Sequence, residues 1–298
     1  MKKKIIVVVG PTASGKSDLT FKIAKDLKFE IVVCDAYQVY KEISKGINKP
    51  NDSELKAIKH NFVNHISIYD KWDVKRFKEE FEQLIENNSV TNFILEGGSN
   101  LYIHALVNNY NLQDLNDSLT YDEFSNEQLF EKLKALDYEE SLKINVNNRK
   151  RIEQALRIIE STHQKKSVLD RQNKEPLYDF FIIRVKPDRE KLYKKINERA
   201  DKMYSNGWLD EVKQLKQLDE NVVNLTAFKA LGYVDMFNAL NEGVEVDFNK
   251  IKKKTRQYAK RQETWIKNKF DVHYQFESYE QYGDLLEKVR EFLNGKTN

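Results

Sequence analysis

The sequence predicts an α/β protein in which helices cover a parallel β-sheet. Short, continuous runs of apolar and β-branched residues recur along the chain, as is typical of strands buried on both faces of a parallel sheet. Stretches with a helical pattern separate these runs. Apolar residues make up 40% of the 298-residue chain and charged residues 33%, so it can bury a core under a polar surface. This length fits one large or two modest domains.

The apolar runs place the strands of the predicted sheet at residues 5–9, 30–34, 92–95 and 180–185. Between residues 113 and 178 the pattern is helical and polar, without a strand. We therefore expect a discontinuous core domain, residues 1–112 and 179–298, interrupted by a helical insertion domain at 113–178. From 189 to 268 the chain again follows a helical period, which predicts a helical C-terminal region.

Composition excludes several classes of protein. A single cysteine, Cys34, excludes a disulfide framework and any zinc site built on several cysteines. No apolar run approaches the roughly 18 residues that a membrane span requires. The short apolar run after the basic start leads into a glycine loop, which favours a first strand in a cytoplasmic protein over a signal peptide. The net charge of +3 says little about partners, so any nucleic-acid surface must come from a local basic patch.

A complete phosphate-binding motif follows the first predicted strand and precedes a predicted helix. The segment GPTASGKS matches the pattern G-x-x-x-x-G-K-[ST], and this position is the one that the chemistry requires. Backbone N–H groups would surround a phosphate chain, Lys16 would neutralise it, and the Ser17 hydroxyl would hold Mg²⁺. The residues expected to bind the diphosphate are Gly10, Pro11, Thr12, Ala13, Ser14, Gly15, Lys16 and Ser17. The motif indicates a P-loop NTPase-like sheet and a diphosphate or triphosphate ligand, but not the reaction.

Polar residues follow the next two strands of the core. Asp35 comes after the second strand and Ser99 after the third, where the carboxyl ends of parallel strands face a common crevice. Asp35 is a candidate general base, although an aspartate here also suits a turn. Ser99 is a candidate ligand for a phosphate oxygen, although it also suits a helix N-cap. Glu96, which ends the third strand, is a further candidate for the acidic residue beside the metal.

The order of motifs along the chain resembles the bacterial tRNA dimethylallyltransferases, over about residues 5–268. The last motif is specific to this family, whereas the phosphate loop is shared with many unrelated proteins. The matching segments are GPTASGKS at 10–17, DAYQVY at 35–40, GGSNLY at 97–102, NNRKRI at 147–152, ALGY at 230–233 and TRQYAKRQETW at 255–265.

This resemblance implies a prenyl transfer. The dimethylallyl group of dimethylallyl diphosphate would pass to N6 of adenosine 37 in tRNA, and diphosphate would leave with the help of Mg²⁺. By position, Asp35 is then the general base and Ser99 stands where the family has a catalytic threonine. Lys16 and Arg199 would stabilise the negative charge that grows on the leaving group. The resemblance also implies that the target base leaves the anticodon stack.

Two basic segments are candidates for contact with tRNA. We expect the protein to be a monomer and to bind the anticodon stem-loop of the tRNA. Residues 249–270 contain nine basic residues and one acid. A second group on the insertion includes Arg149 and Arg157, and in the family this region grips the stem-loop. A solvated charged face would explain the segment at 249–270 equally well. The positions carried over as tRNA contacts are Asp35, Ala36, Tyr37, Gln38, Lys150, Arg151, Ile152, Glu153, Gln154, Arg256 and Lys260.

The sequence departs from the family pattern in several places, and two other functions stay open. Ala36 replaces a usual serine, which puts one RNA contact in doubt, whereas Ser99 for threonine keeps the hydroxyl. A small-molecule kinase could use the same Lys16, Ser17 and Asp35, but it would not need the motif at 255–265. A tRNA-binding protein without activity is the other alternative, and the intact phosphate loop argues against it.

Overall fold

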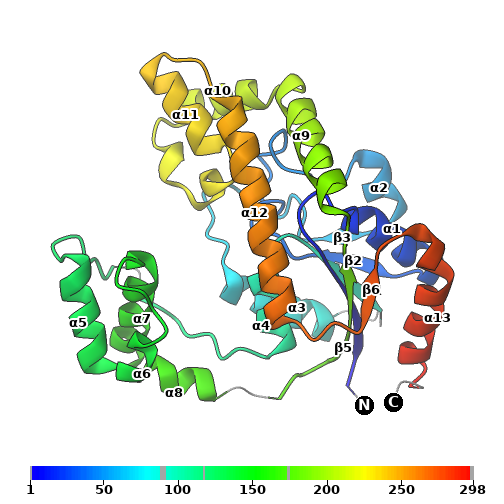
Figure 1. Ribbon diagram of the computed structural model, residues 1–298, viewed down its shortest axis with the longest axis horizontal. Helices are drawn as coiled ribbons and strands as arrows, with labels where there is room; N and C mark the ends of the chain where they lie inside the picture. Colours follow the sequence, from blue (N-terminus) through cyan, green and yellow to red (C-terminus); the bar gives the residue numbers. More distant parts are fainter. Residues whose placement is uncertain (1, 88–91, 117, 173–174, 296–298) are drawn as a thin grey trace. The chain divides into compact units, whose positions relative to one another are not determined.

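The computed structural model describes residues 2–87, 92–116, 118–172 and 175–295. Within these residues, a six-stranded sheet has the order β3-β2-β4-β1-β5-β6, and every neighbouring pair is parallel (Figure 1). The strands are β1 (Lys4–Val9), β2 (Glu30–Val33), β3 (His60–Asn61), β4 (Phe93–Glu96), β5 (Asp179–Val185) and β6 (Tyr274–Phe276). The predicted parallel α/β class is confirmed.

Each of the four predicted strands is present, and two further strands extend the sheet at its edges. The sequence did not indicate β3 and β6, because they are only two and three residues long and carry no continuous apolar run. The central position of β1 and β4 explains the continuous apolar character of the first run. Val7 and Leu95, for example, are fully buried in neighbouring strands.

Helices follow most strands and predominate in the C-terminal third of the chain. They are α1 (Lys16–Leu27), α2 (Asp52–Ala57), α3 (Val74–Asn87), α4 (Asn100–Val107), α5 (Asn126–Leu136), α6 (Tyr138–Ser141), α7 (Arg149–Thr162), α8 (Lys166–Arg171), α9 (Arg189–Ser205), α10 (Trp208–Leu218), α11 (Tyr233–Glu242), α12 (Phe248–Lys269) and α13 (Tyr282–Leu293). The helical C-terminal region that the sequence predicts is confirmed. None of these helices, as far as the chain is described, is both long and apolar enough to span a membrane.

Alternate residues of the strands point to opposite faces of the sheet. On one face, Ile6 and Val8 of β1 pack in a buried cluster with Leu19 and Ile23 of α1 and Leu285 of α13. This packing fixes α1 directly beneath the sheet. Its N-terminus is therefore held at the carboxyl end of β1, where a helix dipole favours an anion.

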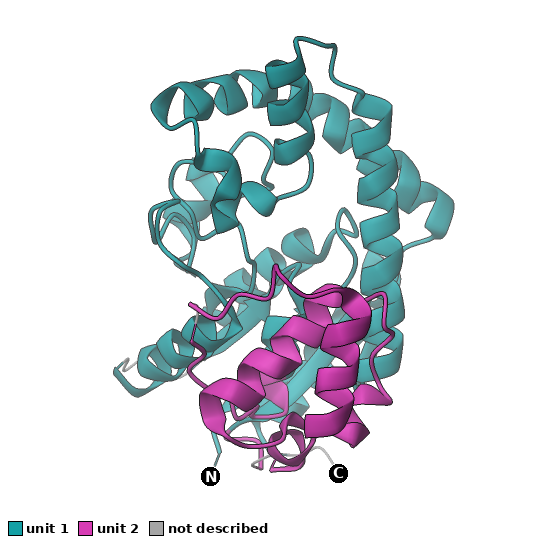
Figure 2. Cartoon of the chain, turned by 90° about the vertical axis from the view of Figure 1, so that its left-hand side faces the viewer, with its two compact units in different colours: residues 1–104, 178–298 teal, residues 105–177 magenta. Residues whose placement is uncertain are grey.

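The chain divides into two compact units (Figure 2). Unit 1 comprises residues 1–104 and 178–298 and contains the sheet, and unit 2 comprises residues 105–177. The sequence-based expectation placed the insertion at 113–178. Unit 2 has its own apolar core, in which Leu129 and Leu133 of α5 pack with Ile152 and Leu156 of α7.

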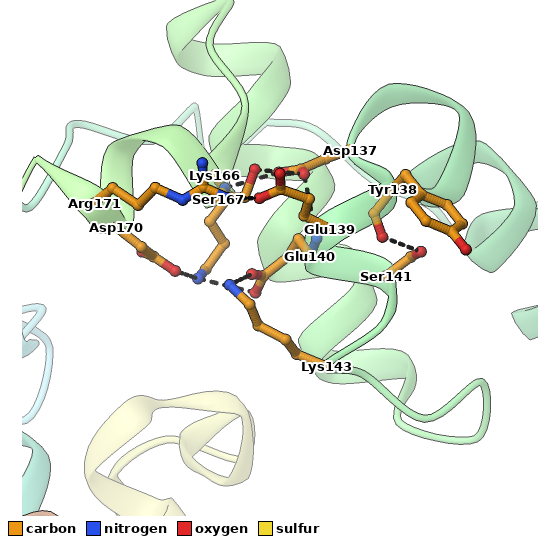
Figure 3. A network of polar contacts seen from close by, with 10 residues as sticks. All are labelled: Asp137, Tyr138, Glu139, Glu140, Ser141, Lys143, Lys166, Ser167, Asp170 and Arg171. Atoms are coloured by element: carbon orange, nitrogen blue, oxygen red, sulfur yellow. Dashed lines mark hydrogen bonds and ion pairs between the residues drawn. The ribbon is translucent and has the colours of Figure 1, made fainter.

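A buried polar network fastens α8 to α6 inside unit 2 (Figure 3). Asp137 accepts hydrogen bonds from the Ser167 hydroxyl at 2.7 Å and from the Ser167 backbone N–H at 2.8 Å. Lys166 pairs with Glu140 at 3.0 Å and with Asp170 at 2.5 Å. Burial acts to raise the pKa of Asp137, but the hydrogen bonds from Ser167 and Glu140 outweigh it and lower that pKa. The network keeps the buried carboxylates partnered, as a stable polar core requires.

Candidate active site

The phosphate loop leaves β1 at Gly10 and enters α1 at Lys16. Gly15 has a φ of 89°, a left-handed conformation that glycine adopts without strain. A Cβ at Gly10 would lie 2.8 Å from Ser14 Oγ and 3.1 Å from the Val185 carbonyl oxygen, so this position also needs glycine. The two glycines of the motif therefore serve the tight backbone path that precedes the helix.

Lys16, Ser17 and Glu96 lie together at the carboxyl ends of β1 and β4. The Ser17 hydroxyl donates a hydrogen bond to Glu96 Oε2 at 3.1 Å, and Glu96 is only 4% exposed. Burial raises the pKa of Glu96, although the charge of Lys16 and the Ser17 hydrogen bond act in the opposite direction. Burial lowers the pKa of Lys16, while Glu96 and Asp35 favour its charged form. Glu96, a further candidate from the sequence, is therefore the carboxylate beside the phosphate-loop serine.

Asp35 lies in the turn that follows β2. Its Oδ1 accepts hydrogen bonds from the backbone N–H groups of Tyr37 at 2.9 Å and Gln38 at 3.2 Å. Its Oδ2 faces Gly98, because a Cβ built on that glycine would lie 2.9 Å from this oxygen. One oxygen thus serves the turn that the sequence allowed, and the other is directed toward the loop after β4.

Ser99 lies at the start of α4, and its side chain contacts the turn after β2. Its carbonyl oxygen accepts the N–H of Tyr102 at 2.9 Å, so its backbone begins α4. Its Oγ accepts a hydrogen bond from the Ala36 N–H at 2.9 Å. The preceding Gly97 approaches β2 closely, since a Cβ there would lie 2.0 Å from the Cys34 carbonyl oxygen. The loops after β2 and β4 are therefore packed backbone to backbone.

Arg199 reaches the phosphate loop from α9. Its guanidinium donates a hydrogen bond to Thr12 Oγ1. Burial lowers the pKa of Arg199, and the charge of Asp35 acts against this shift. Arg199, Lys16 and Asp35 therefore influence one another electrostatically within unit 1, and the two cations lie where a phosphate chain would need positive charge.

Two residues of α12, Tyr258 and Gln262, also belong to this site, although the sequence pattern does not indicate such a role for them. Gln262 accepts a hydrogen bond from the Thr12 N–H at 2.8 Å and donates one to the Gly98 carbonyl oxygen at 2.8 Å. The Tyr258 hydroxyl donates to the same carbonyl at 3.0 Å. The segment at 255–265 contained both residues, but a helical pattern alone does not show which loops a helix touches.

A pocket of about 260 Å³ opens beside Ser17 and Glu96. Gln38 and Lys49 line it, and Gln38 Oε1 is buried there without a hydrogen-bond partner in the described structure. Lys49 donates hydrogen bonds to Asn64 Oδ1 at 2.6 Å and to the Tyr40 carbonyl oxygen. Burial lowers the pKa of Lys49 to about 8. The pocket thus extends the phosphate loop toward a polar, partly buried wall.

A buried carboxylate holds the loop that carries Lys49. Glu211 of α10 accepts hydrogen bonds from the Ser44 N–H at 2.8 Å, the Lys45 N–H at 2.9 Å and the Tyr233 hydroxyl at 2.7 Å. A Cβ on Gly46 would lie 2.1 Å from Trp208 Nε1, so the loop lies tightly against α10 and α11. The hydrogen bonds of Glu211 therefore fix one wall of the pocket to the C-terminal helices.

The residues expected to contact tRNA occupy different surroundings within each unit. In unit 1, the side chain of Lys260 is exposed. Arg256 donates a hydrogen bond to Asn197 Oδ1 at 2.6 Å. The Tyr37 hydroxyl donates one to the Lys229 carbonyl oxygen at 3.1 Å. Ala36 lies in the turn after β2, between Asp35 and the partly buried Tyr37.

In unit 2, α7 separates exposed residues from core residues. Lys150, Arg151 and Gln154 are exposed, whereas the side chain of Ile152 is fully buried in the core of this unit. Glu153 pairs with Arg149 at 2.7 Å. Arg149 and Arg157 also donate to backbone carbonyls of the same unit, so part of this basic group braces the fold.

The donor set around Ser17 fits Mg²⁺. This ion prefers oxygen ligands and commonly takes one or two from protein and the rest from substrate phosphates and water. The Ser17 hydroxyl and the Glu96 carboxylate offer such oxygens next to the phosphate loop. No cluster of three or more histidine, cysteine, aspartate or glutamate side chains that could hold a metal occurs among the described residues. An ion here would therefore take its remaining oxygen ligands from a bound phosphate and from water.

Comparison with known proteins shows the family of this chain. The family model described as IPP transferase matches residues 38–269. A tRNA dimethylallyltransferase of Malacoplasma penetrans is 63% identical over 99% of this chain and 100% of its own, and one of Mycoplasmoides gallisepticum is 35% identical over 90% and 89%.

Solved structures show the same fold. A crystal structure of a eukaryotic dimethylallyltransferase acting on tRNA has a TM-score of 0.82, with 26% identity, and covers 99% of this chain and 80% of its own. The full-length tRNA isopentenylpyrophosphate transferase of Bacillus halodurans has a TM-score of 0.71, with 27% identity, and covers 99% and 97%.

Proposed function

Because the chain belongs to the IPP transferase family and is a tRNA dimethylallyltransferase by class, we propose the reaction in detail. The dimethylallyl group of dimethylallyl diphosphate passes to N6 of adenosine 37, 3′ of the anticodon, and diphosphate leaves. The observation that carries the proposal is the grouping of Lys16, Arg199 and Asp35 around one phosphate loop within unit 1. We also propose that the enzyme acts as a cytoplasmic monomer, an expectation from the sequence and the resemblance.

The phosphate loop grips the leaving group in this proposal. As the allylic C–O bond breaks, negative charge grows on the diphosphate, and groups placed to meet that charge lower the barrier. Free backbone N–H groups of the phosphate loop, the ammonium of Lys16 and the guanidinium of Arg199 would stabilise this negative charge. Mg²⁺, held by Ser17 with Glu96 nearby, would add positive charge to the same oxygens. The position of Glu96 beside Ser17 supports this role.

Asp35 takes the proton from the attacking amine. An exocyclic amine is a weak nucleophile, so a carboxylate within hydrogen-bond reach must orient it and accept its proton. Oδ2 of Asp35 is suited to this task because Oδ1 is held by the turn. The Ser99 hydroxyl, next to this turn, would contact the diphosphate or the reacting centre.

Recognition of tRNA uses both the turn after β2 and exposed basic residues. The target adenosine leaves its stack to reach Asp35, and the turn residues Ala36, Tyr37 and Gln38 contact it. On unit 2, Lys150, Arg151 and Gln154 would contact the anticodon stem-loop, with Ile152 and Glu153 holding that face of α7 in shape. Lys260 and Arg256 of α12 would contact the RNA backbone.

The test uses unmodified tRNA, Mg²⁺ and dimethylallyl diphosphate labelled in the prenyl group, with a parallel reaction that contains ATP in place of this donor. The proposal predicts label at the adenosine 3′ of the anticodon and no ATP turnover. A tRNA with guanosine at this position is the matched control and should stay unlabelled. ATP consumed on adding small-molecule acceptors, without label in tRNA, would assign the site to a kinase instead.

A further inference from the structure

One glutamine joins the two loops that contain the proposed active site. Gln262 is 3% exposed, and both ends of its carboxamide are used. Oε1 accepts the Thr12 N–H at 2.8 Å, and Nε2 donates to the Gly98 carbonyl oxygen at 2.8 Å. The partners are a donor and an acceptor, so the site needs a side chain with both functions. Glutamate would lose the donor, and methionine would lose both.

The neighbours of Gln262 hold the same two loops. The Tyr258 hydroxyl, one helical turn earlier on α12, donates to the Gly98 carbonyl oxygen at 3.0 Å. Arg199 donates to the Thr12 hydroxyl, so this residue is held through its backbone by α12 and through its side chain by α9. The contacts fix Thr12 and Gly98 relative to each other, although 86 positions separate them in sequence.

The relative position of Thr12 and Gly98 matters for the chemistry. Thr12 lies in the loop that would bind the leaving diphosphate, and Gly98 faces Oδ2 of Asp35, the proposed base. A bond-forming step is fast only when leaving group, nucleophile and base are held in one geometry. A buried hydrogen-bonded bridge can set that geometry without contacting the substrate.

We propose that Gln262 is a positioning residue that fixes the phosphate loop against the Gly97–Gly98–Ser99 loop. The inference rests on the proposed function, because it takes the loop at residues 10–17 as the diphosphate site. It goes beyond that function by assigning a role to a buried residue of α12, whose exposed face carries Lys260.

Four variants test the proposal in the full-length enzyme: Gln262→Glu, Gln262→Met, Tyr258→Phe and the control Gln257→Glu. The control introduces the same charge on an exposed position of the same helix. Each variant is measured for kcat and KM of the prenyl donor, for binding of Mg²⁺–pyrophosphate by calorimetry, and for tRNA binding by fluorescence anisotropy. Circular dichroism melting curves report the folded fraction.

Both Gln262 variants should lower kcat by about tenfold or more and weaken pyrophosphate binding. Gln262→Met leaves the Thr12 N–H without its acceptor, and Gln262→Glu places a carboxylate oxygen against the Gly98 carbonyl oxygen in place of a donor. Affinity for tRNA should stay at the wild-type value. Tyr258→Phe should lose less, since Gln262 still donates to Gly98. The double variant with Gln262→Met should lose more activity than the two single variants together, because both donors to the Gly98 carbonyl oxygen are then absent.

Three results would overturn the inference. Normal kcat and pyrophosphate affinity in Gln262→Met, with a loss confined to Gln262→Glu, would show an effect of charge and not of the bridge. A loss of kcat that only follows the folded fraction would show a structural role. Wild-type protein that transfers the prenyl group without binding pyrophosphate at residues 10–17 would remove the inference, whereas absence of any transfer would remove the proposed function itself.

Discussion

The Ser99 hydroxyl oxygen accepts the backbone N–H of Ala36 at 2.9 Å, so a residue proposed to contact the substrate also holds the turn of Asp35. Ser99→Ala should therefore disturb the turn as well as remove a hydroxyl, and we expect kcat to fall by about tenfold or more. Ser99→Thr keeps the acceptor and should retain most activity. Initial rates of prenyl transfer measure both. Equal losses in the two variants would contradict a role for the hydroxyl.

Asp35→Asn separates the two functions of Asp35. The amide oxygen can still accept the N–H groups of Tyr37 and Gln38, but the second position no longer accepts a proton. We expect kcat to fall by about 10²–10⁴-fold with tRNA affinity preserved. Asp35→Ala should add a loss of tRNA affinity, because the turn loses its acceptor. Full turnover by Asp35→Asn would show that another group takes the proton.

Glu96→Gln tests the metal site beside the phosphate loop. The amide still partners the Ser17 hydroxyl but removes a negative charge near the proposed Mg²⁺. We expect a higher Mg²⁺ concentration for half-maximal activity, and complete loss of transfer when the metal is chelated. The measurement is a Mg²⁺ titration of initial rates. An unchanged titration curve would mean that Glu96 does not assist the ion.

Glu211 makes a stability prediction that is independent of the chemistry. Glu211→Ala would leave the donors of Ser44, Lys45 and Tyr233 without their acceptor, which costs about 3 kcal/mol or more. The control is Asp210→Ala, whose side chain is exposed and pairs with Lys213 on the surface. Denaturant unfolding of both variants gives the free energies. Equal free energies of unfolding would show that the hydrogen bonds to Glu211 contribute nothing to stability.

Lys49 makes a prediction about pH. Its folded-state pKa is lowered to about 8, mainly by burial, whereas the unfolded chain keeps a lysine protonated up to about pH 10.4. Between these values the unfolded state binds more protons, so the contribution of Lys49 to stability rises with pH. The unfolding free energy of wild type, measured relative to that of Lys49→Met, should therefore increase from pH 8 to pH 10.

The matched control for Lys49→Met is Lys41→Met, because Lys41 is an exposed lysine of the same loop segment. Parallel behaviour of the two variants would show that the surroundings of Lys49 do not favour its neutral form.

Local sequence determined the parts of this protein that depend on short stretches of chain. The apolar runs gave the four main strands, and the motif at 10–17 lies between a strand and a helix, as it predicted. These features follow from the burial preferences and backbone freedom of neighbouring residues. The edge strands β3 and β6 did not follow, because strands of two or three residues form only where a neighbouring strand already offers its hydrogen bonds.

Tertiary structure alone decided how the site is assembled. The sequence marked Asp35, Ser99 and Glu96 as candidates, but it did not show that Glu96 meets Ser17 or that Ser99 holds Ala36. It gave no sign that Gln262, 250 positions from Thr12, bonds to the phosphate loop. A hydrogen bond depends on distance and direction, and between distant residues only the packing of strands and helices sets both.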